Sequence, residues 1–134
     1  MKIIIDTNIL FSALISTQSH LRDILLESEE EFYAPTYLFV ELFRYKDKMM
    51  KYTKLSEEEM YEYLNILTER IHFIQVDFIS TENRQIAYDL CKDKDIKDTL
   101  FVALSLELDA KLWTGDKKLK THLIKNGFSM IFNY

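Results

Sequence analysis

The sequence predicts a single α/β domain built on a mostly parallel sheet of about five strands, with helices on both faces. Two observations favour this class. Ile3, Ile4 and Ile5 form an uninterrupted run of β-branched residues, which is typical of a strand buried on both faces of a parallel sheet. Segments with strand and helix patterns then alternate along the chain, as in proteins whose parallel strands are joined by helices.

Short β-rich or apolar segments mark the expected strands, and apolar residues at helical spacing mark the helices. Strands are predicted over residues 2–6, 32–34, 71–76, 111–114 and 129–132. Helices are predicted over residues 8–14, 21–26, 36–52, 99–108 and 117–125, with two more beginning at Ser56 and at Ser80 or Thr81. Ser56 and Glu59 have the spacing of a capping box, which marks a helix start.

Length and composition indicate one globular domain over residues 1–134. The chain is 48% apolar and 13% aromatic, which disfavours disorder. No apolar run approaches the ~20 residues of a membrane span, and Asp6 interrupts the N-terminal apolar run that a signal peptide would need. Cys91 is the only cysteine, so no internal disulfide can form, which suits a reducing cytosol. We therefore predict a cytoplasmic protein without membrane contact.

The net charge of −5 weighs against a nucleic-acid partner, because phosphate binding depends largely on Lys and Arg. A bound divalent cation would reverse the local sign of an acidic cluster and weaken that objection. Basic residues are also concentrated in two stretches, one from Arg44 to Lys54 and one that includes Lys117 and Lys118. The first stretch is equally consistent with a solvated helix face.

Four carboxylates fall at positions that could face one crevice. Asp6 and Asp116 each follow a predicted strand, Glu41 lies in the helix after the second strand, and Asp98 opens an apolar helix. Ligands of open α/β sheets bind beyond the carboxyl ends of the strands. Carboxylates gathered there repel one another unless a hard cation lies among them, and Mg²⁺ or Mn²⁺ prefers such oxygen ligands.

Each of these acids also has a purely structural interpretation. Asp6 and Asp116 are good helix-cap residues, and either Asp95 or Asp98 could cap the helix over residues 99–108. Glu41 sits in an apolar run and could pair with Arg44, three residues further on. Other site chemistry finds little support, because the three histidines lack zinc-ligand spacing and the chain has no glycine-rich phosphate loop.

Four sequence blocks occur in a characteristic order: residues 5–10 (Ile-Asp-Thr-Asn-Ile-Leu), Glu41, residues 97–104 (Lys-Asp-Thr-Leu-Phe-Val-Ala-Leu) and residues 114–116 (Thr-Gly-Asp). Together these blocks resemble the PIN-domain nucleases, especially the single-domain VapC-like toxins of type II toxin–antitoxin pairs. The resemblance implies helices around a sheet of about five strands and an Mg²⁺- or Mn²⁺-dependent cut in RNA. It further implies an acidic site with polar support, formed by Asp6, Glu41, Asp98 and Asp116 with Asn8 and Thr114, and Asp95 as an additional candidate ligand.

The resulting hypothesis is an endoribonuclease that uses metal-assisted phosphodiester hydrolysis and needs no histidine base. Lys117, Lys118 and Arg44 are candidate substrate-binding residues, and a cognate antitoxin and a homodimer are candidate partners. Two alternatives stay open. One is a non-catalytic module whose acidic pocket receives a basic partner. The other is a phosphatase of the haloacid dehalogenase type with Asp6 as nucleophile, although that chemistry wants an acid where this chain has Asn8.

Overall fold

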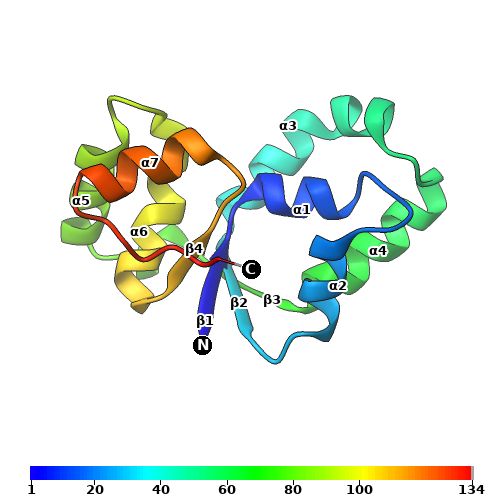
Figure 1. Ribbon diagram of the computed structural model, residues 1–134, viewed down its shortest axis with the longest axis horizontal. Helices are drawn as coiled ribbons and strands as arrows, with labels where there is room; N and C mark the ends of the chain where they lie inside the picture. Colours follow the sequence, from blue (N-terminus) through cyan, green and yellow to red (C-terminus); the bar gives the residue numbers. More distant parts are fainter. Residues whose placement is uncertain (134) are drawn as a thin grey trace.

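A parallel sheet forms the centre of the molecule, as predicted. The structure is a computed structural model and describes residues 1–133. Its strands are β1 (Lys2–Ile5), β2 (Glu31–Pro35), β3 (Ile71–Ile74) and β4 (Lys111–Trp113), in the spatial order β3-β2-β1-β4. All neighbouring pairs are parallel. The α/β class is therefore confirmed (Figure 1).

The expectation of about five strands is wrong, because the described sheet has four. Residues 129–132 run beside β4, but they pair only through an isolated bridge between Leu112 and Ile131. Leu112 exchanges backbone hydrogen bonds with its neighbours there, accepting from the Phe132 N–H at 2.9 Å and donating to the Met130 carbonyl at 2.8 Å. One bridged residue anchors the tail to the sheet edge without extending the ladder into a strand.

Two helical layers enclose the sheet. Figure 1 shows α1 (Thr7–Ala13), α2 (His20–Glu27), α3 (Tyr37–Tyr52) and α4 (Glu57–Glu69) on one side, and α5 (Thr81–Cys91), α6 (Thr99–Leu108) and α7 (Lys117–Lys125) on the other. Two 3₁₀ turns, η1 (Val76–Phe78) and η2 (Ile96–Asp98), connect the elements around α5. The helix α6 packs across β1, β2 and β4. Among the described helices, none combines the length and apolarity needed to cross a bilayer.

The helix boundaries follow from capping residues that the sequence displays. Ser56 and Glu59 form a complete capping box at the start of α4, as predicted. Ser80 caps α5 by accepting a hydrogen bond from the Asn83 N–H. Gly127 has a positive φ of 92° just after α7, a conformation that glycine adopts at low cost.

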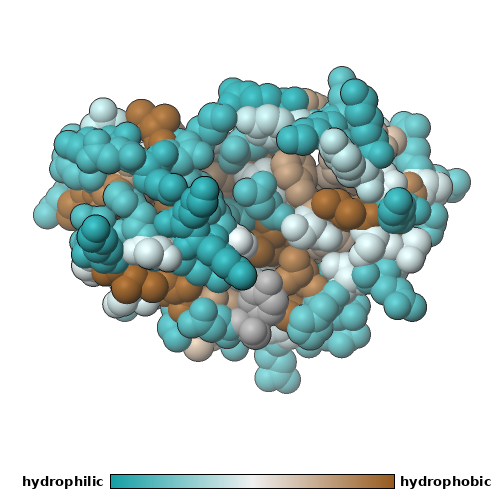
Figure 2. Space-filling model, turned by 45° about the horizontal axis from the view of Figure 1, so that its top comes forward, coloured by the Kyte–Doolittle hydropathy of each residue, from teal (hydrophilic) through white to brown (hydrophobic). Residues whose placement is uncertain are grey.

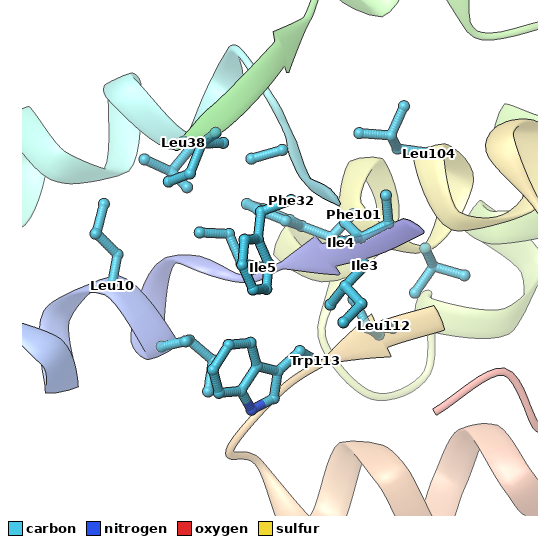
Figure 3. Packing of buried hydrophobic residues seen from close by; sticks show 14 of the residues in the cluster. Ile3, Ile4, Ile5, Leu10, Phe32, Leu38, Phe101, Leu104, Leu112 and Trp113 are labelled. Atoms are coloured by element: carbon cyan, nitrogen blue, oxygen red, sulfur yellow. The ribbon is translucent and has the colours of Figure 1, made fainter. Parts of the chain in front are cut away.

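The core is built on both faces of β1. Ile3, Ile4 and Ile5 are each fully buried, as the unbroken apolar run predicted. Figure 3 shows Leu10 and Leu38 approaching the sheet from one side, and Leu104 of α6 lying on the other. Burial on both faces fixes the end of β1, and therefore the position of the residue that follows it.

The strand order creates a switch point between β1 and β4. The connection from β1 leads to α1 on one side of the sheet, whereas the connection from β4 leads to α7 on the opposite side (Figure 1). A backbone hydrogen bond of 3.2 Å from the Asp6 N–H to the Trp113 carbonyl holds the two strand ends together. Divergent connections of this kind leave an open crevice at the carboxyl edge of the sheet.

A buried arginine fixes the segment that links α1 to α2. The Arg22 guanidinium donates to the carbonyls of Ala13 (2.8 Å), Ser16 (2.9 Å) and Thr17 (2.6 Å). It also lies over the Tyr63 ring of α4, at 4.1 Å from the ring centroid. The planar fork of arginine can satisfy several carbonyls at once, which a lysine cannot do.

We expect Arg22→Ala to lower the free energy of unfolding by about 3 kcal/mol, because it leaves these carbonyls without their charged donor. Arg22→Lys should recover only part of the loss. Arg84→Ala is a matched control that removes a single exposed side-chain hydrogen bond to Thr81, and it should change stability by less than about 0.5 kcal/mol. Urea denaturation measures all three variants, and equal losses for Arg22→Ala and Arg84→Ala would refute the assignment.

Candidate active site

A pocket of about 510 Å³ opens at the carboxyl edge of the sheet, at the switch point. Five carboxylates line it: Asp6, Glu41, Asp95, Asp98 and Asp116. They come from the end of β1, from α3, from both ends of the η2 turn and from the start of α7. The fold therefore brings together all four acids that the sequence singled out, and the fifth that it named as an additional candidate. Figure 2 turns this edge of the molecule forward and shows hydrophobic residues exposed among hydrophilic ones near its centre.

Asp6 combines a structural and an electrostatic role. It is only 4% exposed, and one of its oxygens accepts a 3.0 Å hydrogen bond from the Ile9 N–H at the start of α1. Burial raises the pKa of Asp6 to about 6, although hydrogen bonds from Thr114 and Ile9 oppose the shift. The capping interpretation is correct, but it does not account for a carboxylate that lines a pocket beside other acids.

The sequence left open whether Asp95 or Asp98 acts as a helix cap, and the structure gives the two residues different roles. Asp95 caps the η2 turn by accepting a 3.0 Å hydrogen bond from the Lys97 N–H. Asp98 occupies the N-cap position of α6, but its side chain makes no capping hydrogen bond. The Asp98 carboxylate is half-buried and faces the pocket with its oxygens uncommitted to the helix.

Glu41 is held by a hydroxyl rather than by a cation. Its Oε1 accepts a 2.8 Å hydrogen bond from Thr7 Oγ1 of α1. The predicted alternative, an ion pair with Arg44, does not form among the described residues, although Arg44 still opposes the upward shift that burial imposes on the pKa of Glu41. The apolar run around Glu41 is not buried throughout, because Phe43 is 80% exposed.

Asp116 and Thr114 tie the end of β4 to the pocket. Asp116 Oδ1 accepts 3.0 Å hydrogen bonds from the N–H groups of Lys118 and Leu119, so Asp116 caps α7. Thr114 is fully buried, accepts a 3.1 Å hydrogen bond from the Asp116 N–H and donates to Asp6. Asn8 lines the pocket from α1. Thr114 thus links two of the acids directly.

The electrostatics of the pocket reflect mutual repulsion. Burial, the largest cause, and the negative charges of the neighbouring acids together raise the pKa of Asp98 to about 7; these acids are Asp95, Asp6, Asp116 and Glu41. Glu41 and Asp116 likewise add to the upward shift of Asp6. Near neutral pH the ionised carboxylates therefore repel one another, and a cation placed among them would offset this repulsion.

The donor set fits a hard divalent ion in its chemistry. All the acids offer oxygen, which Mg²⁺ and Mn²⁺ prefer over the nitrogen and sulfur ligands of zinc. Although five carboxylates line the pocket, no three His, Cys, Asp or Glu side chains in residues 1–133 lie close enough together to hold a metal ion as they stand. Holding an ion would therefore require side-chain rotations that bring the carboxylates closer together.

The other end of the same pocket is apolar, which the sequence did not predict. Phe11 of α1 and Ile15, just beyond the end of α1, line it on one side, and Tyr45, Met49 and Tyr52 line it from α3. Two basic residues, Lys48 and Lys97, also line the pocket. In the sequence, only the helical spacing from Glu41 indicated that these residues of α3 share one face with it. The contribution of α1 depends on tertiary packing and had no signal in the sequence.

The candidate substrate-binding residues lie outside the acidic pocket. Lys117 and Lys118 line a neighbouring cleft together with Lys94, Thr121 and His122. This basic cleft lies beside the acidic pocket, because residues adjacent in sequence line the two cavities. Lys94 of the cleft precedes Asp95 of the pocket, and Lys117 of the cleft follows Asp116 of the pocket. Arg44 is exposed on α3 and lines neither cavity.

The fold and the pocket define a class: a parallel α/β domain with an acidic crevice at the carboxyl edge of its sheet. The family model of the PIN domain matches residues 4–127, and the chain belongs to that family. PIN domains are generally nucleases, which are hydrolases of nucleic acids. No match to this chain exists among curated proteins.

Proposed function

We propose that this protein is a divalent-metal-dependent endoribonuclease whose site is the acidic pocket. The observation that carries the proposal is the convergence of five carboxylates, from segments far apart in sequence, on one pocket at the switch point of the sheet. Membership in the PIN family favours a nuclease over the phosphatase and binding-module alternatives.

In this proposal Asp6, Glu41, Asp98 and Asp116 hold one or more Mg²⁺ or Mn²⁺ ions, with Asp95 at the edge of the set. When bound, such an ion supplies an acidic water as nucleophile and positive charge beside the phosphate. Thr7 and Thr114 orient Glu41 and Asp6 through their hydroxyls. The carboxylates act as ligands rather than as nucleophiles, so the reaction needs no histidine base.

The phosphates that flank the cut are proposed to lie in the basic cleft. Lys94, Lys117 and Lys118 concentrate positive charge there, immediately beside the acidic pocket. Neutralising phosphates with lysines releases condensed counterions, and this release makes binding depend on salt. The arrangement lets a protein with a net charge of −5 bind a polyanion locally.

We expect the double variant Lys117→Ala/Lys118→Ala to reduce the magnitude of the slope of log affinity against log salt concentration by about 1.4, because each of the two lost contacts to a single strand removes about 0.7. The double variant Lys120→Ala/Lys125→Ala is the control, since it removes two lysines of the same helix that do not line the cleft. Fluorescence anisotropy with a labelled RNA oligonucleotide gives both slopes. Identical slopes would remove Lys117 and Lys118 from the RNA path.

The proposal extends to partners and location. We place the protein in the cytoplasm as the toxin of a type II pair, neutralised by a cognate antitoxin, and expect a homodimer. Apolar side chains exposed along α3, namely Phe39, Val40 and Phe43, support a protein contact on this helix. Light scattering of the purified protein measures the mass that distinguishes a dimer from a monomer.

The decisive assay incubates the purified protein with total RNA and with defined oligonucleotides in Mg²⁺, in Mn²⁺ and in EDTA. Internal cleavage that appears with either ion and disappears in EDTA is the expected result. Cleavage that persists unchanged in EDTA would contradict metal dependence. No cleavage in any buffer, together with tight binding of a basic peptide, would favour the non-catalytic module.

A further inference from the structure

One face of α3 lines the acidic pocket over about three turns of the helix. Glu41, Tyr45, Lys48, Met49 and Tyr52 all line it, at the i, i+4, i+7, i+8 and i+11 positions of a helical stripe. With a rise of about 1.5 Å per residue, Tyr45 lies roughly 6 Å and Tyr52 roughly 16 Å along the helix from the carboxylate end. The stripe thus passes from charge to aromatic surface within a single cavity.

Tyr45 is pinned in place by neighbours from two other elements. Phe11 of α1 packs edge-on against its ring, with the centroids 6.3 Å apart. The Lys97 ammonium donates a 3.3 Å hydrogen bond to its hydroxyl. A ring that is fixed before binding loses little conformational entropy when a planar ligand packs against it.

Tyr52 differs from Tyr45 in being open to solvent. It is the last residue of α3, it lines the pocket, and 62% of its surface is exposed. The wall beside it is completed by Met49 and Ile15. An exposed aromatic ring at the rim of a mixed polar and apolar cavity is a surface on which a flat, weakly polar ligand can stack.

Two lysines between the acidic end and the aromatic end of the pocket indicate the class of ligand. Lys48 and Lys97 line the same pocket, so an anionic group can be neutralised between the acids and the aromatic wall. A nucleotide has this composition, with a phosphate on one side and a stackable base on the other. An apolar peptide side chain would fill the aromatic end, but it would not use the two ammonium groups.

We propose that the stripe from Tyr45 to Tyr52 is a nucleobase subsite, an inference that rests on the proposed nuclease function. An unpaired base stacks on Tyr52, at the end of the stripe away from the carboxylates, and Lys48 and Lys97 contact a phosphate between that base and the cut. A base held in a duplex is already paired and stacked, so it cannot occupy this wall.

The test compares Tyr52→Ala, Tyr52→Phe and the control Tyr88→Ala, which removes an exposed tyrosine from α5, outside the pocket. The substrate is a single-stranded RNA with a mapped cleavage site, intact or with an abasic ribose at each of the nearest positions. We expect Tyr52→Ala to raise KM about tenfold with kcat nearly unchanged, because base–aromatic stacking contributes that much. Tyr52→Phe keeps the ring and should behave as the wild type.

The abasic substrates provide the signature that a merely structural role would not give. At one position the abasic ribose should raise KM for the wild type and cause no further loss in Tyr52→Ala, since the two changes remove the same contact. An abasic penalty of equal size in both proteins, or a Tyr52→Ala that matches Tyr88→Ala, would overturn the subsite. If the Tyr52→Ala defect is the same for every abasic substrate, Tyr52 does not contact a base, and this result would also overturn the subsite.

Failure of the nuclease proposal is recognised separately, as a wild-type protein that cuts no RNA with either ion. Binding of the intact and abasic RNAs to the wild-type protein, measured by fluorescence anisotropy, then tests the subsite by itself. Tighter binding of the intact RNA, lost in Tyr52→Ala, would support the subsite without any cleavage. Equal binding of both RNAs would overturn it.

Discussion

Replacing Asp98 with asparagine is expected to reduce metal-dependent RNA cleavage by at least about 10³-fold. A metal ion at a phosphoryl group contributes several kcal/mol of transition-state stabilisation, and each ~1.4 kcal/mol is a factor of ten in rate. Asparagine keeps the shape of the side chain but removes the negative charge that would hold the ion. Rates with saturating RNA and Mg²⁺ measure the effect.

The fold should survive this change. The Asp98 side chain makes no capping hydrogen bond to α6, and its charge is repelled by four neighbouring carboxylates. Asp98→Asn should therefore be at least as stable as the wild type at about pH 8 without metal. Asp93→Asn is the control, because Asp93 is exposed and does not line the pocket. Full Mg²⁺-dependent activity in Asp98→Asn would remove this residue from the site.

The second large effect is the dependence of stability on pH and metal. The pKa values of Asp6 and Asp98 are raised from 3.8 to about 6 and about 7 in the folded protein. At pH values between the unfolded pKa and the raised folded pKa of each group, the folded state binds more protons than the unfolded state. The free energy of unfolding therefore falls as pH rises through this range. We expect the metal-free protein to be a few kcal/mol more stable near pH 5 than near pH 8, since one pKa unit corresponds to about 1.4 kcal/mol.

Metal should reverse this loss. At about pH 8 an ion at a hundred times its Kd would add about 2.7 kcal/mol, because it binds the folded state alone. Urea denaturation at both pH values, in EDTA and in Mg²⁺, measures the four free energies. The double variant Asp6→Asn/Asp98→Asn should show a flatter pH dependence and little response to Mg²⁺. A metal-free wild type that becomes more stable from pH 5 to pH 8 would contradict the account.

Local sequence signals account for most of the fold. The isoleucine run predicted a strand buried on both faces, and Ile3, Ile4 and Ile5 are fully buried. The helix over residues 117–125 was predicted to its ends, because Asp116 caps one end and Gly127 follows the other. Residues 129–132 have strand-like composition, but pairing at a sheet edge is a tertiary event, and only Ile131 bridges to β4.

The acidic end of the pocket was more predictable than the apolar end. Asp6 and Asp116 follow buried strands, so the parallel topology alone places them at one edge of the sheet. Tyr45 and Tyr52 share a helical face with Glu41, but whether that face meets the pocket depends on how α1 packs against α3. Thr7 has no local pattern that marks it as the partner of Glu41, since the two lie 34 residues apart.

A divalent ion held in the acidic pocket should be visible by anomalous diffraction from crystals soaked in Mn²⁺ at about pH 8. We expect an anomalous peak within coordination distance of Asp98 and at least one of Asp6, Glu41 and Asp116. The Asp98→Asn crystals, soaked in the same way, should show a weaker peak or none. A pocket without an anomalous peak in the wild type, or a peak of unchanged height in Asp98→Asn, would show that these carboxylates do not form a metal site.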